Sequence, residues 1–244
     1  MESKEKKLRL NKFLADTLGI SRREADRLIQ QKSVEINSKL IKEPYYRVDI
    51  ENDKVFFNGE KLEYKNQTIL LILNKPRFYI TTKKDPQKRR TVYELLDKKY
   101  HSLKYIGRLD YESRGLLIFT NKGELIEQLS RPIYKIPKTY KVIINKPIRN
   151  EDIKKLQNGI ILKPENIKTK KAEVKKLSNR ELLITITEGK KRQIRRMLQS
   201  VGYRVVDLQR IRFGKVELKN LDLKEGEYKV KIFTYLKEAL NFIV

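Results

Sequence analysis

The fold of this chain is decided by residues 107–125, which read GRLDYESRGLLIFTNKGEL. The apolar run from Leu116 to Phe119 has the length and composition of a buried strand. The turn signal Asn121-Lys122-Gly123 closes this strand, and residues 124–129 then have the spacing of a short helix. Asp110 is therefore expected in a loop directly before a rigid strand.

A loop aspartate has two interpretations. Aspartate often serves as a turn or cap residue through its own side chain, and spacing alone favours that role for Asp110. A loop anchored to a strand is also where reactive side chains are usually held, because the strand fixes what the loop presents. Other features of the sequence are needed to distinguish the structural role of Asp110 from the reactive one.

The charge of the chain indicates a polyanionic partner. Lys and Arg number 57 against 31 Asp and Glu, a formal net charge of +26, and 36% of the residues are charged where about 25% is usual. A field of that sign attracts nucleic acid. Charge alone does not separate RNA from DNA or from an acidic membrane, and it also contributes to ordinary surface solvation.

The residue inventory excludes several chemistries. The chain has no Cys and a single His, His101, so it offers no disulfide, no thiolate zinc site and no distinguishable Ser-His-Asp triad. A zinc-dependent base deaminase is excluded because it needs a Cys pair. No apolar stretch approaches 18 residues and the first ten residues lack a hydrophobic segment, so we expect a cytoplasmic protein with no membrane partner.

The N-terminal residues predict a small module with a basic helix. Residues 8–18 have helical spacing and end at Gly19, and the capping box 21–24 starts a second helix. Short alternating strands follow, and Asn58-Gly59 is the expected tight turn of a hairpin within residues 53–64. The second helix places Arg22, Arg23 and Arg27 on its outer face, where their planar forks suit phosphate oxygens.

Two resemblances give these features a context. Residues 107–123 resemble the GRLD-x-x-[ST]-x-G-L-L…TN-x-G signature of bacterial ribosomal RNA pseudouridine synthases, of the kind typified by small-subunit synthase A and large-subunit synthase B. Residues 8–41 resemble the small RNA-binding domain named for ribosomal protein S4, although Lys32 and Ser38 replace glycines that are usual there. The length and the N-terminal module favour the large-subunit type.

Two further stretches resemble the family's other motifs. The pattern K-x-Y-x-V at residues 138–142 places Tyr140 where the family's tyrosine stacks on the target uracil. Residues 188–197, EGKKRQIRRM, resemble the third motif, whose basic residue pairs with the catalytic aspartate; Arg195 is the matching position, with Arg192 and Lys191 as alternatives. The resemblance thus implies Asp110, Tyr140 and Arg195 as catalytic residues.

Residues 74–78 depart from the family pattern N-K-P-x-G. Phe78 stands where the glycine is usual, and a phenylalanine would be strained there if the backbone needs a positive φ. The basic loop 83–90, KKDPQKRR, follows; it is either a solvated surface or an RNA clamp that orders on binding.

The resemblance implies an α+β fold with two domains. Residues 8–64 would form the S4-like α/β module, and residues 67–244 a pseudouridine synthase domain with a mixed, mainly antiparallel sheet. The implied activity is isomerisation of a uridine in ribosomal RNA by a monomer without metal or other cofactor. The alternative is a non-catalytic RNA-binding or ribosome-assembly protein on the same fold. The basic residues expected to contact RNA are Arg22, Arg23, Arg27, Lys75, Arg108, Arg114, Lys138, Arg192 and Arg196.

Overall fold

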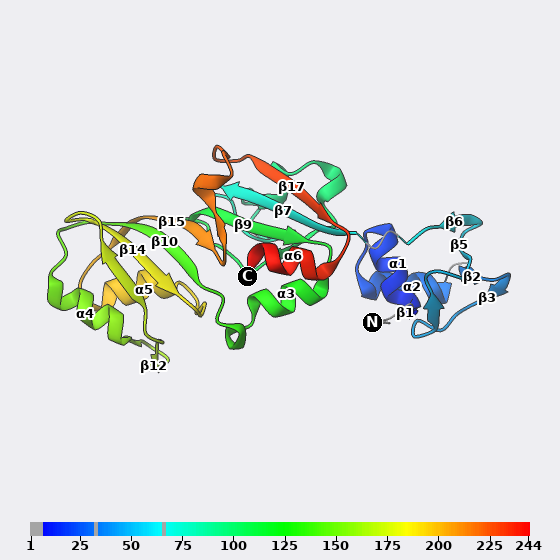
Figure 1. Ribbon diagram of the computed structural model, residues 1–244, viewed down its shortest axis with the longest axis horizontal. Coiled ribbons are helices and arrows are strands. Elements are labelled where there is room, and N and C mark those ends of the chain that lie inside the picture. The colour runs from blue at the N-terminus through cyan, green and yellow to red at the C-terminus, as the bar shows by residue number, and fades with distance from the viewer. Residues whose placement is uncertain (1–6, 32–33, 65–66) are drawn as a thin grey trace. The chain divides into compact units, whose positions relative to one another are not determined.

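The computed structural model describes residues 7–31, 34–64 and 67–244, which form two compact units (Figure 1). The first unit ends at Gln67 and the second begins at Thr68. Lys32, one of the two replaced glycines, lies outside the described residues.

The first unit packs two helices against short strands. Its elements are β1 (Lys7–Arg9), α1 (Leu10–Leu18), α2 (Arg22–Gln31), β2 (Val34–Ile36), β3 (Lys39–Leu40), β4 (Arg47–Asp49), β5 (Val55–Phe57) and β6 (Glu60–Leu62). Strand β1 pairs with β4, which is why helix α1 begins two residues later than its apolar spacing predicts. The order of the other strands is β3-β2-β5-β6, and the helices bury Phe13, Leu14 and Ile29 in the core.

Both hairpin turns of this unit use the left-handed backbone. Asn58 and Gly59 have φ of 50° and 83° between β5 and β6, which confirms the predicted tight turn. Asn37 and Ser38 have φ of 51° and 66° between β2 and β3. Ser38 thus adopts a left-handed backbone that glycine accommodates more readily than serine.

The second unit is built on one large mixed sheet, as the resemblance implies. Its strand order is β13-β14-β10-β15-β9-β7-β17, with β16 beside β15 and β8 beside β9. These strands are β7 (Thr68–Lys75), β8 (Lys104–Ile106), β9 (Arg114–Thr120), β10 (Lys138–Ile144), β13 (Glu173–Lys176), β14 (Glu181–Ile186), β15 (Val205–Phe213), β16 (Val216–Glu217) and β17 (Tyr228–Phe233). In the described part of this sheet only β9 and β15 pair in parallel.

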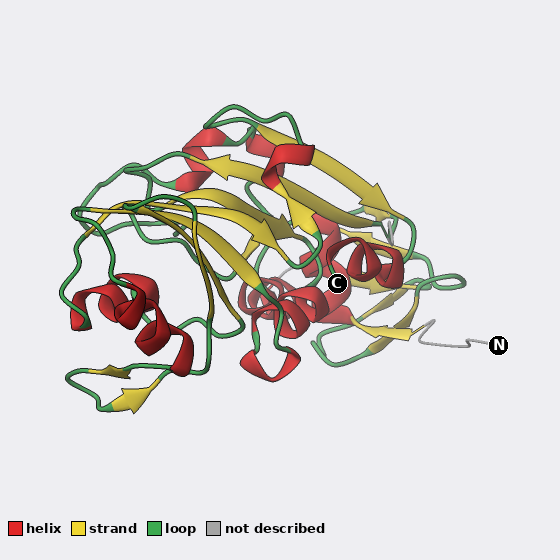
Figure 2. Cartoon of the chain, turned by 60° about the vertical axis from the view of Figure 1, so that its left-hand side comes forward, coloured by secondary structure: helices red, strands yellow, loops and turns green. Residues whose placement is uncertain are grey.

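Helices cover both faces of this sheet (Figure 2). They are α3 (Gly123–Ser130), α4 (Asn150–Asn158), α5 (Gln193–Ser200) and α6 (Leu236–Ile243), and a separate hairpin joins β11 (Ile161–Leu162) to β12 (Ile167–Lys168). Because β7 alternates, Leu70 and Ile72 pack with α3 and α6, whereas Leu71 and Leu73 belong to the core that includes α4 and α5. Burying each of these leucine and isoleucine side chains contributes about 1.5–3 kcal/mol.

The parallel contact between β9 and β15 requires a glycine. Gly115 has φ of 102°, and a Cβ atom there would lie 2.3 Å from the carbonyl oxygen of Arg210. Only a residue without a side chain lets β9 start this close to β15. This approach fixes the position of the loop that carries Asp110.

Candidate active site

Asp110 lines a cavity of about 870 Å³ in the second unit, to which the family-like motifs contribute. The half-buried Asp110 lies in the loop between β8 and β9. Tyr140 of β10 lines the same cavity, and Lys190, Lys191 and Arg192 line it just before α5. The fold therefore brings Asp110 and Tyr140 to one cavity with a basic rim.

Several hydrogen bonds fix the Asp110 loop. The backbone N–H of Ser113 donates to the Asp110 carbonyl at 3.0 Å, which closes a turn around the aspartate. The Thr81 hydroxyl donates to the Leu109 carbonyl at 2.8 Å. Thr81 is a contribution that the sequence analysis missed, since a threonine in an irregular segment gives no signal of its partner.

Lys75 stabilises the Asp110 loop through hydrogen bonds to backbone carbonyls. Its Nζ atom donates to the carbonyls of Ser113 at 2.7 Å, Pro76 at 2.9 Å and Asp110 at 3.3 Å. Burial lowers the pKa of Lys75 from its usual 10.5 to about 8, while the charge of Asp110 acts against that shift. The RNA contact expected of Lys75 has no support here, because the residue is fully buried and its three donors are used inside the protein.

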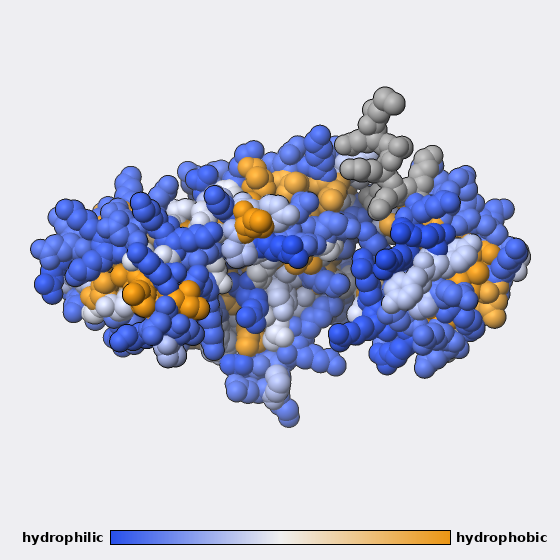
Figure 3. All heavy atoms as spheres, turned by 90° about the horizontal axis from the view of Figure 1, so that it is seen from below, coloured by the Kyte–Doolittle hydropathy of each residue, from blue (hydrophilic) through white to orange (hydrophobic). Residues whose placement is uncertain are grey.

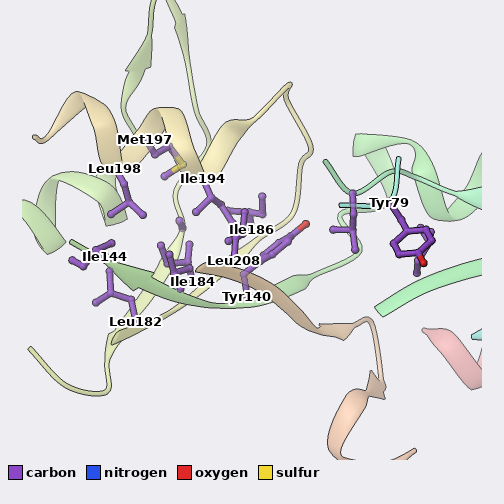
Figure 4. Close-up of a cluster of buried hydrophobic side chains, with 14 of the residues drawn as sticks. Tyr79, Tyr140, Ile144, Leu182, Ile184, Ile186, Ile194, Met197, Leu198 and Leu208 are labelled. Atoms are coloured by element: carbon purple, nitrogen blue, oxygen red, sulfur yellow. The ribbon is translucent and has the colours of Figure 1, made fainter. Parts of the chain in front are cut away.

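Tyr140 lies at the boundary between the core and the cavity. It is 8% exposed and packs with the buried cluster that includes Ile184 and Leu208. Figure 4 shows its hydroxyl pointing away from Leu182 and Ile144, the far side of that cluster. The ring is thus held by apolar packing and still borders the cavity.

Arg195 lies near Asp110 but contacts other atoms of the same loop. Its Nη2 atom donates to the Glu112 carbonyl at 3.2 Å and to the Ser113 hydroxyl at 3.4 Å. Burial lowers the pKa of Arg195, and the charges of Glu112 and Asp110 act in the opposite direction. Among the described residues none forms an ion pair with the Asp110 carboxylate, so the pairing implied for Arg195 is a through-space interaction in this structure.

Glu112 connects Arg192 and Arg195, two of the three arginines in the third motif. Its Oε2 atom lies 2.9 Å from Nη2 of Arg192 and 3.8 Å from Nε of Arg195. The hydrogen bond from Arg192 is the main reason why the pKa of Glu112 is lowered. Sequence reasoning missed Glu112, because nothing in the sequence indicates that Arg192 takes a left-handed backbone, with φ of 50°, directly before α5.

Arg114 and Arg196, both expected to contact RNA, also form internal ion pairs. Arg114 pairs with Asp207 and Glu225, each at 2.7 Å, and its side chain is 24% exposed. Arg196 pairs with Glu165 and donates to the Lys163 carbonyl at 2.7 Å, which ties α5 to the β11–β12 hairpin. Both side chains hold elements of the protein together.

Other predicted contacts differ in exposure. Arg108 is exposed and lines the cavity. Lys138 is half-buried on β10, where burial lowers its pKa to about 8 and its Nζ donates to the Ile136 carbonyl at 3.1 Å. In the first unit Arg22, Arg23 and Arg27 are exposed on α2, and Arg27 pairs with Glu24.

The basic loop 83–90 contains an internal clasp. Arg89 donates two hydrogen bonds to Asp85, from Nη2 at 2.8 Å and from Nε at 2.9 Å. Those bonds are the largest cause that lowers the pKa of Asp85 to about 2. Asp85 and Arg89 both line the cavity, so this part of the loop is organised beside Asp110.

Across residues 7–31, 34–64 and 67–244, no three His, Asp or Glu side chains gather as metal ligands would. Within the same ranges no helix combines the length and apolar character needed to cross a bilayer.

Comparison with known proteins places this geometry in a family. Residues 69–200 match the model of the RNA pseudouridylate synthase family, and residues 8–55 match the S4 domain. The chain is 34% identical over 238 residues to an uncharacterized RNA pseudouridine synthase of Aquifex aeolicus, covering 97% of this chain and 98% of the relative. It is 32% identical over 222 residues to ribosomal small subunit pseudouridine synthase A of Yersinia pestis, covering 91% and 94%.

A solved structure agrees with this assignment. The crystal structure of a pseudouridylate synthase superimposes with a TM-score of 0.67 at 30% identity, covering 97% of this chain and 100% of that one. The chain therefore belongs to the RNA pseudouridine synthases, isomerases that act on uridine in RNA, and it carries an S4 domain at its N-terminal end.

Proposed function

We propose that this protein converts a specific uridine of ribosomal RNA to pseudouridine, with Asp110 as the catalytic aspartate. The supporting observation is that Asp110 and Tyr140, from separate motifs, line one cavity with a basic rim. The cavity volume lies within the roughly 300–1,000 Å³ of typical ligand pockets, so it has room for a flipped base. Extruding that base costs a few kcal/mol, and phosphate contacts offset this cost.

The reaction needs no redox partner. The bond from ribose C1′ to uracil N1 breaks, the ring turns, and a bond from C1′ to C5 forms. The hydrogen on C5 leaves as a proton and N1 gains one, so atoms and electrons balance without a cofactor. Asp110 acts by attack on the sugar or the base, or by removing a ribose proton, and each route needs its ionised carboxylate near the flipped nucleotide.

Tyr140 and Arg195 would support Asp110 in different ways. The Tyr140 ring would stack on the flipped uracil, and such stacking contributes about 1–3 kcal/mol per base. Arg195 would keep Asp110 ionised once the base has displaced water, since an opposite charge nearby favours the charged form. The hydrogen bonds from Arg195 to the Glu112 carbonyl and the Ser113 hydroxyl, which hold it against the Asp110 loop, support this role. Arg108 lines the cavity and would occupy the space that the base leaves.

Ribosomal RNA of the small subunit is the proposed substrate. The named relative from Yersinia pestis is a small-subunit synthase A, as is one from Escherichia coli that is 31% identical over 222 residues. These relatives favour the small subunit over the large-subunit target that the length and the N-terminal module suggested. The exposed arginines of α2 would add phosphate contacts, and much of the surface in Figure 3 is hydrophilic. We further propose that the protein acts as a monomer in the cytoplasm.

Tritium release tests the proposal against its alternative. Transcripts of small- and large-subunit RNA, labelled with tritium at C5 of uridine, are incubated separately with the protein. We expect release from the small-subunit transcript, to a limit of one site. Release only from the large-subunit RNA would contradict the subunit assignment. Binding without release from either transcript, or from the corresponding ribosomal subunits, would favour the non-catalytic assembly protein.

A further inference from the structure

Phe78 occupies a backbone conformation that suits glycine. Its φ is 68°, in the left-handed region, where a bulky side chain is a genuine outlier. The N–H of Phe78 donates to the carbonyl of Tyr111 at 2.7 Å, which holds the strained residue against the loop that follows Asp110. Strain of this kind persists where the surrounding structure fixes it, and it gathers at functional sites.

The Phe78 side chain does not fill the core. It is 52% exposed, so apolar burial offsets only part of the strain. Its ring lies 5.6 Å from the Tyr111 ring at an interplanar angle of 60°, and the Arg77 guanidinium lies 5.1 Å from its centroid. A glycine would satisfy this backbone without strain, so the exposed ring needs another explanation.

Tyr111 connects the Phe78 ring to the cavity that contains Asp110. Tyr111 follows Asp110 directly and lines the cavity, and the Arg89 guanidinium lies 5.8 Å from its ring centroid. Arg89 is held by its clasp to Asp85 and also lines the cavity. Phe78 and Tyr111, with the cations of Arg77 and Arg89, therefore form one continuous surface, which we call the aromatic rim.

A nucleobase fits the aromatic rim better than another ligand class does. Every base has a π-face that stacks on an aromatic ring, and the adjacent phosphate is attracted by arginine. A chain with a formal net charge of +26 brings polyanions to this surface. When one uridine leaves its stack, the neighbouring base also loses a stacking partner, and an aromatic ring beside the cavity can replace it.

We infer that the aromatic rim, with Phe78 as its exposed ring, stacks a nucleotide adjacent to the target uridine. This inference rests on the proposed function and adds a second base-binding position to it. This second position depends on Phe78, which departs from the glycine of the family pattern. It would therefore contribute to the choice of the RNA sequence or structure around the target.

Three variants separate the effect of the ring from that of the backbone strain. Phe78→Tyr keeps the ring and the strain, Phe78→Ala removes the ring and keeps the strain, and Phe78→Gly removes both. We expect KM for the RNA to rise roughly 5- to 150-fold in the alanine and glycine variants, which corresponds to about 1–3 kcal/mol of stacking, and to stay within about twofold for tyrosine. The melting temperature should be higher for glycine than for alanine.

A fourth variant, Phe78→Trp, reports stacking directly. The chain contains no tryptophan, so this variant has a single indole whose fluorescence a stacked base quenches. Ile232→Trp is the matched control, since Ile232 is 59% exposed on β17 and does not line the cavity. We expect saturating RNA to quench the first variant strongly and the control little.

The outcomes distinguish the two proposals. If the wild-type protein releases no tritium from ribosomal RNA, the proposed function fails. If the wild type is active but the alanine and glycine variants keep its KM, or the Phe78→Trp fluorescence is unchanged by saturating RNA, the aromatic rim is not a base-binding position. A KM that follows the melting temperature instead of the ring would equally assign Phe78 a structural role only.

Discussion

Arg192 donates a 2.9 Å hydrogen bond to the Glu112 carboxylate, two residues after Asp110. The same carboxylate lies 3.8 Å from Nε of Arg195, so one acidic side chain orients two arginines beside the cavity. Glu112 also neutralises part of the positive charge there. It therefore affects both the attraction of RNA and the placement of Arg195.

Replacing Glu112 by Gln should separate these two effects. The variant gains net positive charge beside the cavity, so we expect KM for RNA to fall about two- to fivefold at low salt. Arg195 loses an orienting partner, so we expect kcat to fall about three- to tenfold. Steady-state kinetics at fixed ionic strength measures both. An unchanged kcat with a raised KM would mean that Glu112 does not position Arg195.

Replacing Arg114 or Arg108 by Ala compares an arginine in internal ion pairs with an exposed arginine in RNA binding. Arg114→Ala leaves the half-buried Asp207 without its partner, so we expect a loss of about 1–3 kcal/mol in the free energy of unfolding. The slope of log affinity against log salt should not change. Arg108→Ala should leave stability unchanged and make the slope shallower by about one phosphate contact. A shallower slope for Arg114→Ala would show that Arg114 does bind RNA.

Lys138 gives a pH-dependent prediction. Its pKa falls from 10.5 to about 8 because of burial, with Arg210 adding to the shift. Below pH 8 both the folded and unfolded chains are protonated, and burying the charge destabilises the fold by up to about 3 kcal/mol. Between pH 8 and 10.5 the folded lysine has lost its proton while the unfolded one keeps it, so this destabilisation is relieved.

Lys138→Met should therefore be more stable than the wild type at pH 7, and the difference should shrink as the pH rises towards 10.5. Urea unfolding of both proteins at several pH values measures it. The buried Lys75 titrates in the same range in both proteins and largely cancels in the difference. A difference that stays constant across this range would rule out the lowered pKa of Lys138.

Gly115→Ala should disrupt the contact between β9 and β15. The new Cβ would lie 2.3 Å from a backbone oxygen, and φ of 102° is unfavourable for alanine, so we expect a loss of at least about 3 kcal/mol in unfolding free energy. The Asp110 loop lies directly before this contact in the sequence, so activity should fall as well. Gly123→Ala is the control, because nothing lies within 4 Å of its Cβ position. Equal melting temperatures for the two variants would contradict the close approach.

The elements with strong local signals could be predicted from the sequence. The apolar run 116–119 lies in β9, and Asn58-Gly59 forms a hairpin turn. Both could be predicted because burial and turn chemistry depend on adjacent residues. The motif residues Asp110 and Tyr140 could be named through the family resemblance. That they line one cavity depends on β10 pairing with β15, and on β15 pairing with β9.

The roles of the basic residues could not be predicted in the same way. Sequence analysis assigned Lys75, Arg114 and Arg196 to RNA, whereas the structure places each against carbonyl or carboxylate oxygens of distant segments. A lysine or arginine has the same local signal whether its partner is phosphate or protein. The sequence predicts strain at Phe78 only if the backbone there needs a positive φ. The structure meets that condition, because φ of Phe78 is 68°.

The most direct test of the proposed chemistry is the Asp110→Asn variant on tritium-labelled small-subunit RNA. The side chains have nearly the same size, so we expect RNA affinity within about twofold of the wild type and an unchanged melting temperature. Tritium release should fall by at least about 10⁴-fold, because the asparagine has neither the charge nor the basicity of the carboxylate. Tritium release at the wild-type rate from the Asp110→Asn variant would contradict the assignment of Asp110 as the catalytic residue.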